Sequence, residues 1–167
     1  MSVLGGGTFS VDEREAYVRM SRRGEEESTE TEEEGLMLSE DRLAQMAEAE
    51  QFILTVSERG FGKRTSSYAY RRTGRGGQGV ATLDVAKKTG LVVDALPVAD
   101  DDQVMLLTDR GQLVRFAVDQ IRVCGRKTQG VTLFRLDKDE KVTSVVRLSE
   151  KDDAEEGGAD DSPAETA

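Results

Sequence analysis

The residues most able to do chemistry are arginines and lysines that recur in two similar clusters. The first cluster spans 13 positions and the second repeats its layout; the members are Lys63, Arg64, Arg71, Arg72 and Arg75, then Arg115, Arg122, Arg126 and Lys127. Guanidinium and ammonium groups bind phosphate oxygens through charge-assisted hydrogen bonds. Cations at regular spacing suit a ligand whose negative charges recur along its length, as in duplex DNA. Contacts to phosphates position such a ligand without reading its sequence.

Both clusters belong to a stretch that occurs twice. Residues 53–80 and 104–131 superpose without a gap at an offset of 51 residues. Nine positions are then identical: Arg59/Arg110, Gly60/Gly111, Arg64/Arg115, Arg71/Arg122, Gly74/Gly125, Arg75/Arg126, Gln78/Gln129, Gly79/Gly130 and Val80/Val131. A period near 50 residues indicates a propeller blade or another stacked unit. Because equivalent positions of stacked units fall on equivalent surfaces, we expect the repeated cations to form one continuous basic rim.

Each copy also contains a loop rich in glycine. The loop glycines are Gly74, Gly76, Gly77 and Gly79 around Arg75, and Gly125 and Gly130 around Arg126 and Lys127. Such a loop can bring backbone amides close to a phosphate, and the alternative is an ordinary turn at the corner of a blade. The alternative for the arginines is pairing with nearby acids, which we expect for Arg59 and Arg110 because both sit beside acids in hairpin turns.

The alternation of apolar and polar residues predicts four short strands in each copy. The predicted strands cover residues 53–56, 62–65, 80–85 and 91–98, then 104–107, 112–118, 131–136 and 141–148. We therefore expect an all-β fold: a partial β-propeller or β-pinwheel of about two four-stranded blades, with a short helical insert and disordered acidic segments. Residues 66–72 should be extended, with Tyr68 and Tyr70 packing on one face; neither has a neighbouring base that would make it a nucleophile.

The remaining segments frame these blades. We expect residues 1–4 to end a preceding blade (a disordered start is the alternative), 5–52 to be a helical and acidic insert, 53–99 and 100–148 to be blades, and 149–167 to be a disordered acidic tail. Ser10 and Glu13 have the form of a capping box, which predicts a helix to about Arg23. Ser39 predicts the cap of a second helix. The glutamate-rich stretch 25–34 between them should be a disordered linker.

Charge is partitioned along the chain, although the whole carries a formal net charge of −10. Residues 53–148 carry a net +6 between flanks of −9 and −7, which indicates a polyanionic partner. The chain has no histidine and one cysteine, Cys124, so common zinc sites and Ser-His-Asp chemistry are excluded. We expect Cys124 to be a small core residue rather than a reactive thiol. Without an apolar signal or membrane segment, the sequence predicts a soluble, cytoplasmic protein.

These residues resemble a known family. The stretch Leu54–Thr65 with Tyr70–Val80, and the stretch Asp109–Arg115 with Ile121–Val131, closely resemble late blades of the C-terminal β-pinwheel domain of bacterial DNA gyrase A. The resemblance covers about residues 53–148. The family's hallmark box, Gln-Arg-Arg-Gly-Gly-Lys-Gly, has at most a degenerate counterpart in Gly74–Gly79. Insertions like residues 5–52 occur between blades in some members.

The resemblance implies a noncatalytic, DNA-wrapping piece of a type II topoisomerase that supercoils DNA negatively. The chain would be truncated to about the last two of six blades, without the cleavage tyrosine. Separately, its charge predicts that the acidic tail competes with DNA for the basic rim. It implies double-stranded DNA, the remaining gyrase A blades and the gyrase B protein as partners, in the bacterial cytoplasm near the nucleoid. ATP and Mg²⁺ would belong to the other gyrase parts, so no cofactor is expected here. The alternatives are a blade fragment that acts through blade–blade contacts, or the equivalent part of topoisomerase IV.

Overall fold

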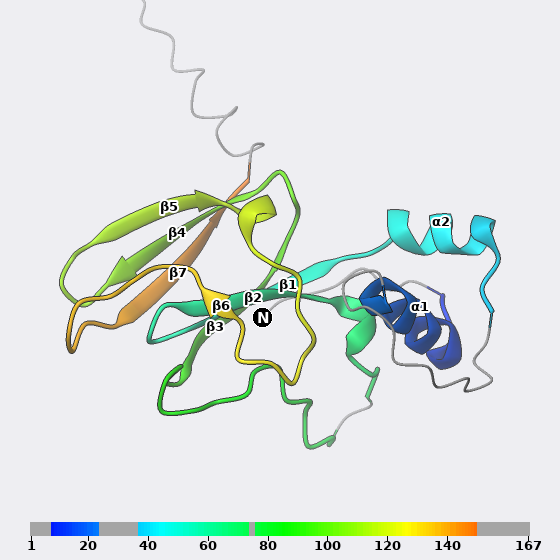
Figure 1. Cartoon of the computed structure of the whole chain (residues 1–167), viewed down its shortest axis with the longest axis horizontal. Coiled ribbons are helices and arrows are strands. Elements are labelled where there is room, and N and C mark those ends of the chain that lie inside the picture. Colours follow the sequence, from blue (N-terminus) through cyan, green and yellow to red (C-terminus); the bar gives the residue numbers. More distant parts are fainter. Residues whose placement is uncertain (1–7, 24–36, 74–75, 150–167) are drawn as a thin grey trace, which may run out of the picture.

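The computed structural model describes residues 8–23, 37–73 and 76–149 (Figure 1). Its elements are α1 (Val11–Arg23), α2 (Glu40–Glu48), β1 (Phe52–Ser57), β2 (Phe61–Ser66), the 3₁₀ helix η1 (Ser67–Ala69), β3 (Val92–Val98), β4 (Gln103–Thr108), β5 (Leu113–Ala117), the 3₁₀ helix η2 (Val118–Gln120), β6 (Val131–Thr132) and β7 (Val142–Leu148). The predictions for residues 1–4, for the linker 25–34, for Gly74 and Arg75, and for the tail from residue 150 lie outside the described residues.

The strands form two antiparallel sheets, which confirms the predicted all-β class. The first sheet has the order β3-β1-β2-β6 and the second the order β5-β4-β7. The hairpin turns lie where the sequence places them, because Gly60 and Gly111 both adopt a positive φ that other residues rarely tolerate. The two helices stand to one side of the sheets (Figure 1).

Strand β6 does not join the sheet of its own copy. It pairs with β2 of the first copy, so that Phe61 lies opposite Thr132 and Gly62 opposite Val131. The prediction of two complete four-stranded blades is therefore wrong in detail: residues 80–85 form no strand, and residues 131–136 contribute only Val131–Thr132. This pairing of β6 with β2, which we call the exchange of β6, requires the two backbones to approach closely. A Cβ atom added at Gly130 would lie 2.5 Å from the carbonyl oxygen of Gly62.

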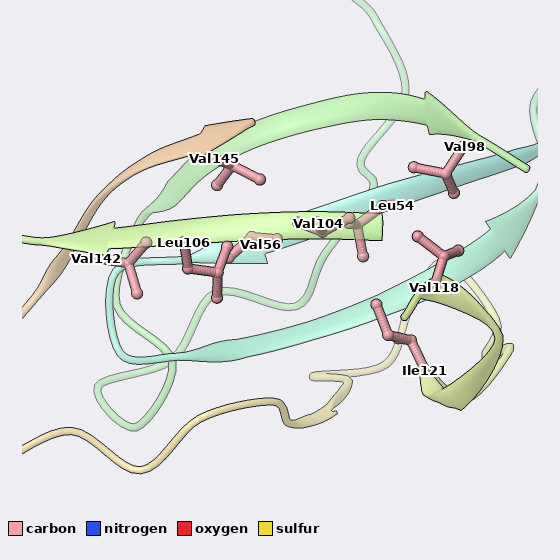
Figure 2. Close-up of a cluster of buried hydrophobic side chains, with 9 residues drawn as sticks. All are labelled: Leu54, Val56, Val98, Val104, Leu106, Val118, Ile121, Val142 and Val145. Atoms are coloured by element: carbon pink, nitrogen blue, oxygen red, sulfur yellow. The ribbon is translucent and has the colours of Figure 1, made fainter. Parts of the chain in front are cut away.

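The hydrophobic core lies between the two sheets (Figure 2). Leu54 and Val56 of β1 and Val104 and Leu106 of β4 are completely buried there. The rest of the cluster comprises Val98, Val118, Ile121, Val142 and Val145. Each such side chain contributes about 1.5–3 kcal/mol when it is removed from water, so this layer holds the two copies together.

The other face of the second sheet is apolar but open. Leu107 lies opposite Leu113, and Met105 opposite Val146, so these four side chains share one face. Leu107, Leu113 and Val146 are 39%, 59% and 49% exposed. By the repeat, Leu107 corresponds to Val56, which is completely buried under the second sheet. The second sheet thus presents the face that in the first sheet is covered by a neighbouring blade.

The predicted helix starts are confirmed. The amide of Ser10 donates to the Glu13 carboxylate at 2.7 Å and the amide of Glu13 donates to Ser10 Oγ at 3.1 Å, which is the reciprocal capping box. Ser39 Oγ accepts from the amide of Arg42 at 3.3 Å. Among the described residues, neither helix is long and apolar enough to cross a membrane.

Tyr68 docks the helices onto the first copy. Its ring packs edge to face against Tyr17 and Phe9, with ring centroids 5.3 and 5.7 Å away, and its hydroxyl donates to the Met46 carbonyl at 2.9 Å. The predicted packing role of this tyrosine is confirmed. The prediction that residues 66–72 are extended is wrong, because Ser66 Oγ accepts from the Tyr68 amide and starts η1 there.

Candidate nucleic-acid interface

An open groove of about 1870 Å³ separates α1 from the glycine loop of the second copy. Its floor is the end of β2 together with η1, and α1 forms one wall. The loop that runs from Arg122 to Val131 forms the opposite wall. The Tyr68 ring packs against Tyr17 of the first wall, while hydrogen bonds between β2 and residues 122–128 fix the second.

The groove is strongly basic although the chain as a whole is acidic. Among the residues that the structure describes, six cationic side chains and two carboxylates line it: Arg14, Arg19, Arg71, Arg122, Arg126 and Lys127, with Glu15 and Glu50. The carboxylate of Glu50 accepts a hydrogen bond from the Tyr17 hydroxyl at 2.9 Å. This concentration of positive charge in a concave surface attracts polyanions.

Four predicted binding residues meet in this groove. Arg71, Arg122 and Lys127 are exposed, whereas Arg126 is half-buried. One guanidinium nitrogen of Arg126 donates to the Ala81 carbonyl at 3.0 Å, and its guanidinium carbon lies 5.7 Å from the centre of the Tyr70 ring. Arg126 is therefore a positioned cation among three solvent-exposed ones. Arg72 is exposed next to Arg71, outside the groove lining.

Lys63 was predicted to contact phosphates, and the structure corrects this. Its side chain is completely buried. The ammonium donates to the carbonyls of Gly125, Arg126 and Thr128 at 2.7, 2.7 and 2.8 Å. A lysine rarely becomes buried unless its charge is satisfied in this way. Lys63 thus shapes the glycine loop of the second copy from beneath.

Arg64 is likewise a link between the copies and not a phosphate ligand. It is 8% exposed. Its guanidinium donates to the Ile121 carbonyl at 2.7 Å and to the Asp119 carbonyl at 3.1 Å, and it pairs with Asp100. Its repeat counterpart, Arg115, lies on the open face of the second sheet opposite Met105. Arg115 is exposed, donates to Gln103, and does not line the groove. The expected single rim is therefore wrong at these positions.

Two cations of the groove escaped the sequence reasoning. Arg14 and Arg19 lie on α1, in a segment whose overall charge is strongly negative. The net charge of the segment gave no sign of them. Acids of the same helix can be neutralised by other partners, as the Glu13 carboxylate is by Arg42 at 2.7 Å. The sequence feature that could have revealed these two arginines is their position on a helix with a predicted cap.

The tyrosine hydroxyls near the helices take part in packing. Burial, together with the hydrogen bond to Glu50, raises the pKa of Tyr17 well above its ordinary value, and burial also raises the pKa of Tyr68. Both hydroxyls are thus held neutral in packing roles. Cys124 is half-buried at the edge of the groove, where its carbonyl accepts from Thr65 at 3.0 Å. Within residues 8–23, 37–73 and 76–149, no three potential ligands cluster as a metal site would require.

The sequence matches a known protein family. Residues 51–99 and 102–149 match the family model described as DNA gyrase C-terminal domain, beta-propeller. The chain belongs to this family. The resemblance noted in the repeats is thereby confirmed, since the matched segments contain both copies.

Gyrase proteins with similar sequences extend beyond this chain. The DNA gyrase A protein of Rickettsia prowazekii (strain Madrid E) is 45% identical over 163 residues, which cover 93% of this chain and 18% of the relative. The DNA gyrase A protein of Granulibacter bethesdensis (strain ATCC BAA-1260 / CGDNIH1) is 44% identical over 177 residues, covering 96% and 19%. The chain thus spans about a fifth of the length of these relatives. A match over 93% must include most of residues 5–52.

Solved structures agree with the family assignment. A structure of the DNA gyrase A C-terminal domain superposes with a TM-score of 0.56 at 31% identity, covering 58% of this chain and 33% of the other. The C-terminal domain of DNA topoisomerase IV superposes with a TM-score of 0.57 at 19% identity, covering 75% and 38%. The second likeness shows a shared fold alone.

Proposed function

We propose that this chain is a noncatalytic module of DNA gyrase A that holds duplex DNA by its phosphates. The single observation that supports this most is the basic groove, which the exposed Arg71, Arg122 and Lys127 line together with the positioned Arg126. The family assignment agrees with it. Exposed Arg72 would extend the contact beyond the groove. Arg75 stays a predicted phosphate ligand outside the described residues.

In this proposal the module bends DNA for the negative supercoiling that the whole enzyme performs. The remaining gyrase A blades and the gyrase B protein would be its partners in the bacterial cytoplasm, and ATP and Mg²⁺ would act in those other parts. Arginine and lysine side chains that meet only phosphates carry no base recognition. We therefore expect binding that is independent of DNA sequence.

A salt series with a duplex of about 40 base pairs tests the proposal. If about five phosphate contacts form, affinity should fall several-hundredfold between about 50 and 200 mM salt. The double variant Arg122→Glu, Lys127→Glu should bind weakly at every salt concentration and show a shallower salt dependence. The matched control is Arg59→Glu, Arg135→Glu, which reverses two exposed charges outside the groove. Equal binding by both double variants would refute the groove as the DNA site.

A second candidate function, blade–blade interaction, is favoured by the open face of the second sheet. Gly111 has a positive φ angle like its counterpart Gly60, yet a Cβ atom there would meet no described atom within 4 Å. At Gly60 a Cβ atom would instead meet the carbonyl oxygen of Phe134, in the segment that follows β6. We propose that the open face of the second sheet receives another blade of the same family. Charge reversal at Arg122 and Lys127 would leave this interaction intact, which separates the two functions.

A further inference from the structure

We propose that α1 is a second DNA-contacting wall, so that one strand of duplex DNA is held between the helical insert and the glycine loop of the second copy. This inference rests on the proposed function and extends it to residues outside the repeats. Arg14 and Arg19 are the residues that would bind phosphates from α1, facing Arg122, Arg126 and Lys127 across the groove.

The helix is held firmly enough to serve as a wall. Ala16 and Tyr17 are buried beneath it, and the Tyr17 hydroxyl donates to Glu50 at 2.9 Å. A guanidinium nitrogen of Arg14 donates to the Tyr70 carbonyl at 3.4 Å, directly before Arg71 in the chain. Arg14 therefore ties the helix to the segment that supplies one of the predicted phosphate ligands. Arg19 is exposed about one and a half turns further along, and also lines the groove.

The charges of α1 are sorted in a way that favours an anion in the groove. The Glu13 carboxylate lies outside the groove lining and is paired with Arg42, which lowers the pKa of Glu13 to about 2. Of the acids on α1, Glu15 alone lines the groove in the described part of the chain. The two arginines outnumber it on this wall. An acidic peptide would meet the same charges, but a basic groove on a blade of the DNA gyrase C-terminal family favours a sugar-phosphate strand.

The inference is tested with the full chain and the same duplex of about 40 base pairs. Arg19→Glu should weaken binding about tenfold at about 100 mM salt and reduce the slope of log affinity against log salt by about one. The reciprocal variant Glu15→Arg should tighten binding and steepen the slope. Both positions are exposed, so neither change removes a core contact. Arg59→Glu is the matched control, because it reverses an exposed charge away from the groove.

The outcomes separate this inference from the proposed function. If Arg19→Glu and Glu15→Arg bind like Arg59→Glu while Arg122→Glu, Lys127→Glu loses binding, the groove binds DNA and α1 is not its wall. If Arg122→Glu, Lys127→Glu also binds like the control, or the unaltered chain does not bind, the proposed function fails and this inference with it. Opposite shifts for Arg19→Glu and Glu15→Arg support the second wall.

Discussion

Equivalent residues of the two copies occupy different environments in this chain. Arg64 is buried and bonded to the second copy, while Arg115, 51 positions later, is exposed on an open sheet face. The difference follows from what lies beyond each sheet: the first sheet has a neighbour and the second, within the described residues, does not. Arg115 is thus better interpreted as a link to a further blade than as a phosphate ligand.

The glycines at the exchange of β6 allow a direct test of this asymmetry. Gly130 and Gly79 are repeat equivalents with φ angles of 77° and 78°, so alanine suffers the same backbone strain at both. Only at Gly130 would the new Cβ atom meet a carbonyl oxygen, that of Gly62, at 2.5 Å. Gly79→Ala should lower the free energy of unfolding by about 1–2 kcal/mol, and Gly130→Ala by clearly more.

Urea unfolding of the two variants at low protein concentration measures this difference. Gly76→Ala serves as a further reference, because Gly76 has a φ of 81° and a Cβ atom there would meet no described atom within 4 Å. Equal losses at Gly130 and Gly79 would mean that the close approach of β2 and β6 is not required for stability.

Sequence reasoning succeeded at residues whose partners are local. The capping box needs only Ser10 and Glu13, three positions apart, and it forms as expected. Lys63 could not be predicted in this way, because its acceptors lie more than 60 positions away in the loop of the other copy. A lysine in a strand ordinarily reaches water, and only the fold reveals that carbonyl groups surround this one.

Between elements, α1 and α2 are joined by the Glu13–Arg42 ion pair. The hydrogen bond from Arg42, followed by that from the Ser10 amide, lowers the pKa of Glu13 from its ordinary 4.5 to about 2. A depressed pKa of the folded state stabilises the fold above the ordinary pKa, and this contribution disappears as the pH falls toward about 2. The attachment of the two helices to each other should therefore weaken as the pH falls from about 4.5 to about 2.

Glu13→Gln provides the test, since glutamine keeps the capping geometry but carries no charge. The variant should melt at a lower temperature than the unaltered chain at about pH 6, and the two melting temperatures should converge near pH 2, where the Glu13 carboxylate becomes protonated. Thermal unfolding followed by far-ultraviolet circular dichroism reports this. A difference that stays constant over this pH range would contradict the role of the carboxylate.

The strands could be predicted from their pattern, but their partners could not. Alternation of apolar residues located β1, β2, β4 and β7 to within about a residue at most ends, because each packs one face on the core. It also predicted a strand after each glycine loop, which is absent in the first copy and limited to Val131–Thr132 in the second. In the first copy, Thr82 instead bonds to Thr55 at 3.2 Å through side chains, and in the second only two residues pair, across the copy boundary.

For the whole molecule, the open face of the second sheet has a measurable consequence. Leu113 is 59% exposed on the edge strand β5, next to Leu107. Unpaired edges and exposed apolar faces promote association unless a charge blocks them. The chain should therefore self-associate at roughly micromolar to millimolar concentrations, and Leu113→Lys should suppress this.

Sedimentation velocity across a dilution series measures the association. Leu91→Lys is the matched control, because Leu91 is 63% exposed but directly precedes β3 of the first sheet. We expect association of the control to equal that of the unaltered chain. A chain that remains monomeric throughout, or equal suppression by both variants, would contradict a blade-receiving face.

The pairing of β6 with β2 also determines when the first sheet can be completed during protein synthesis. A ribosome releases β1 and β2 early, yet the strand that completes their sheet, Val131–Thr132, emerges about 70 residues after Phe61. Until then the outer edge of β2 lacks the strand that pairs with it among the described residues, and the ammonium of Lys63 lacks the carbonyls that surround it in the finished fold. The first blade therefore matures only when the second has been synthesised, so newly made chain is vulnerable to mispairing during that interval.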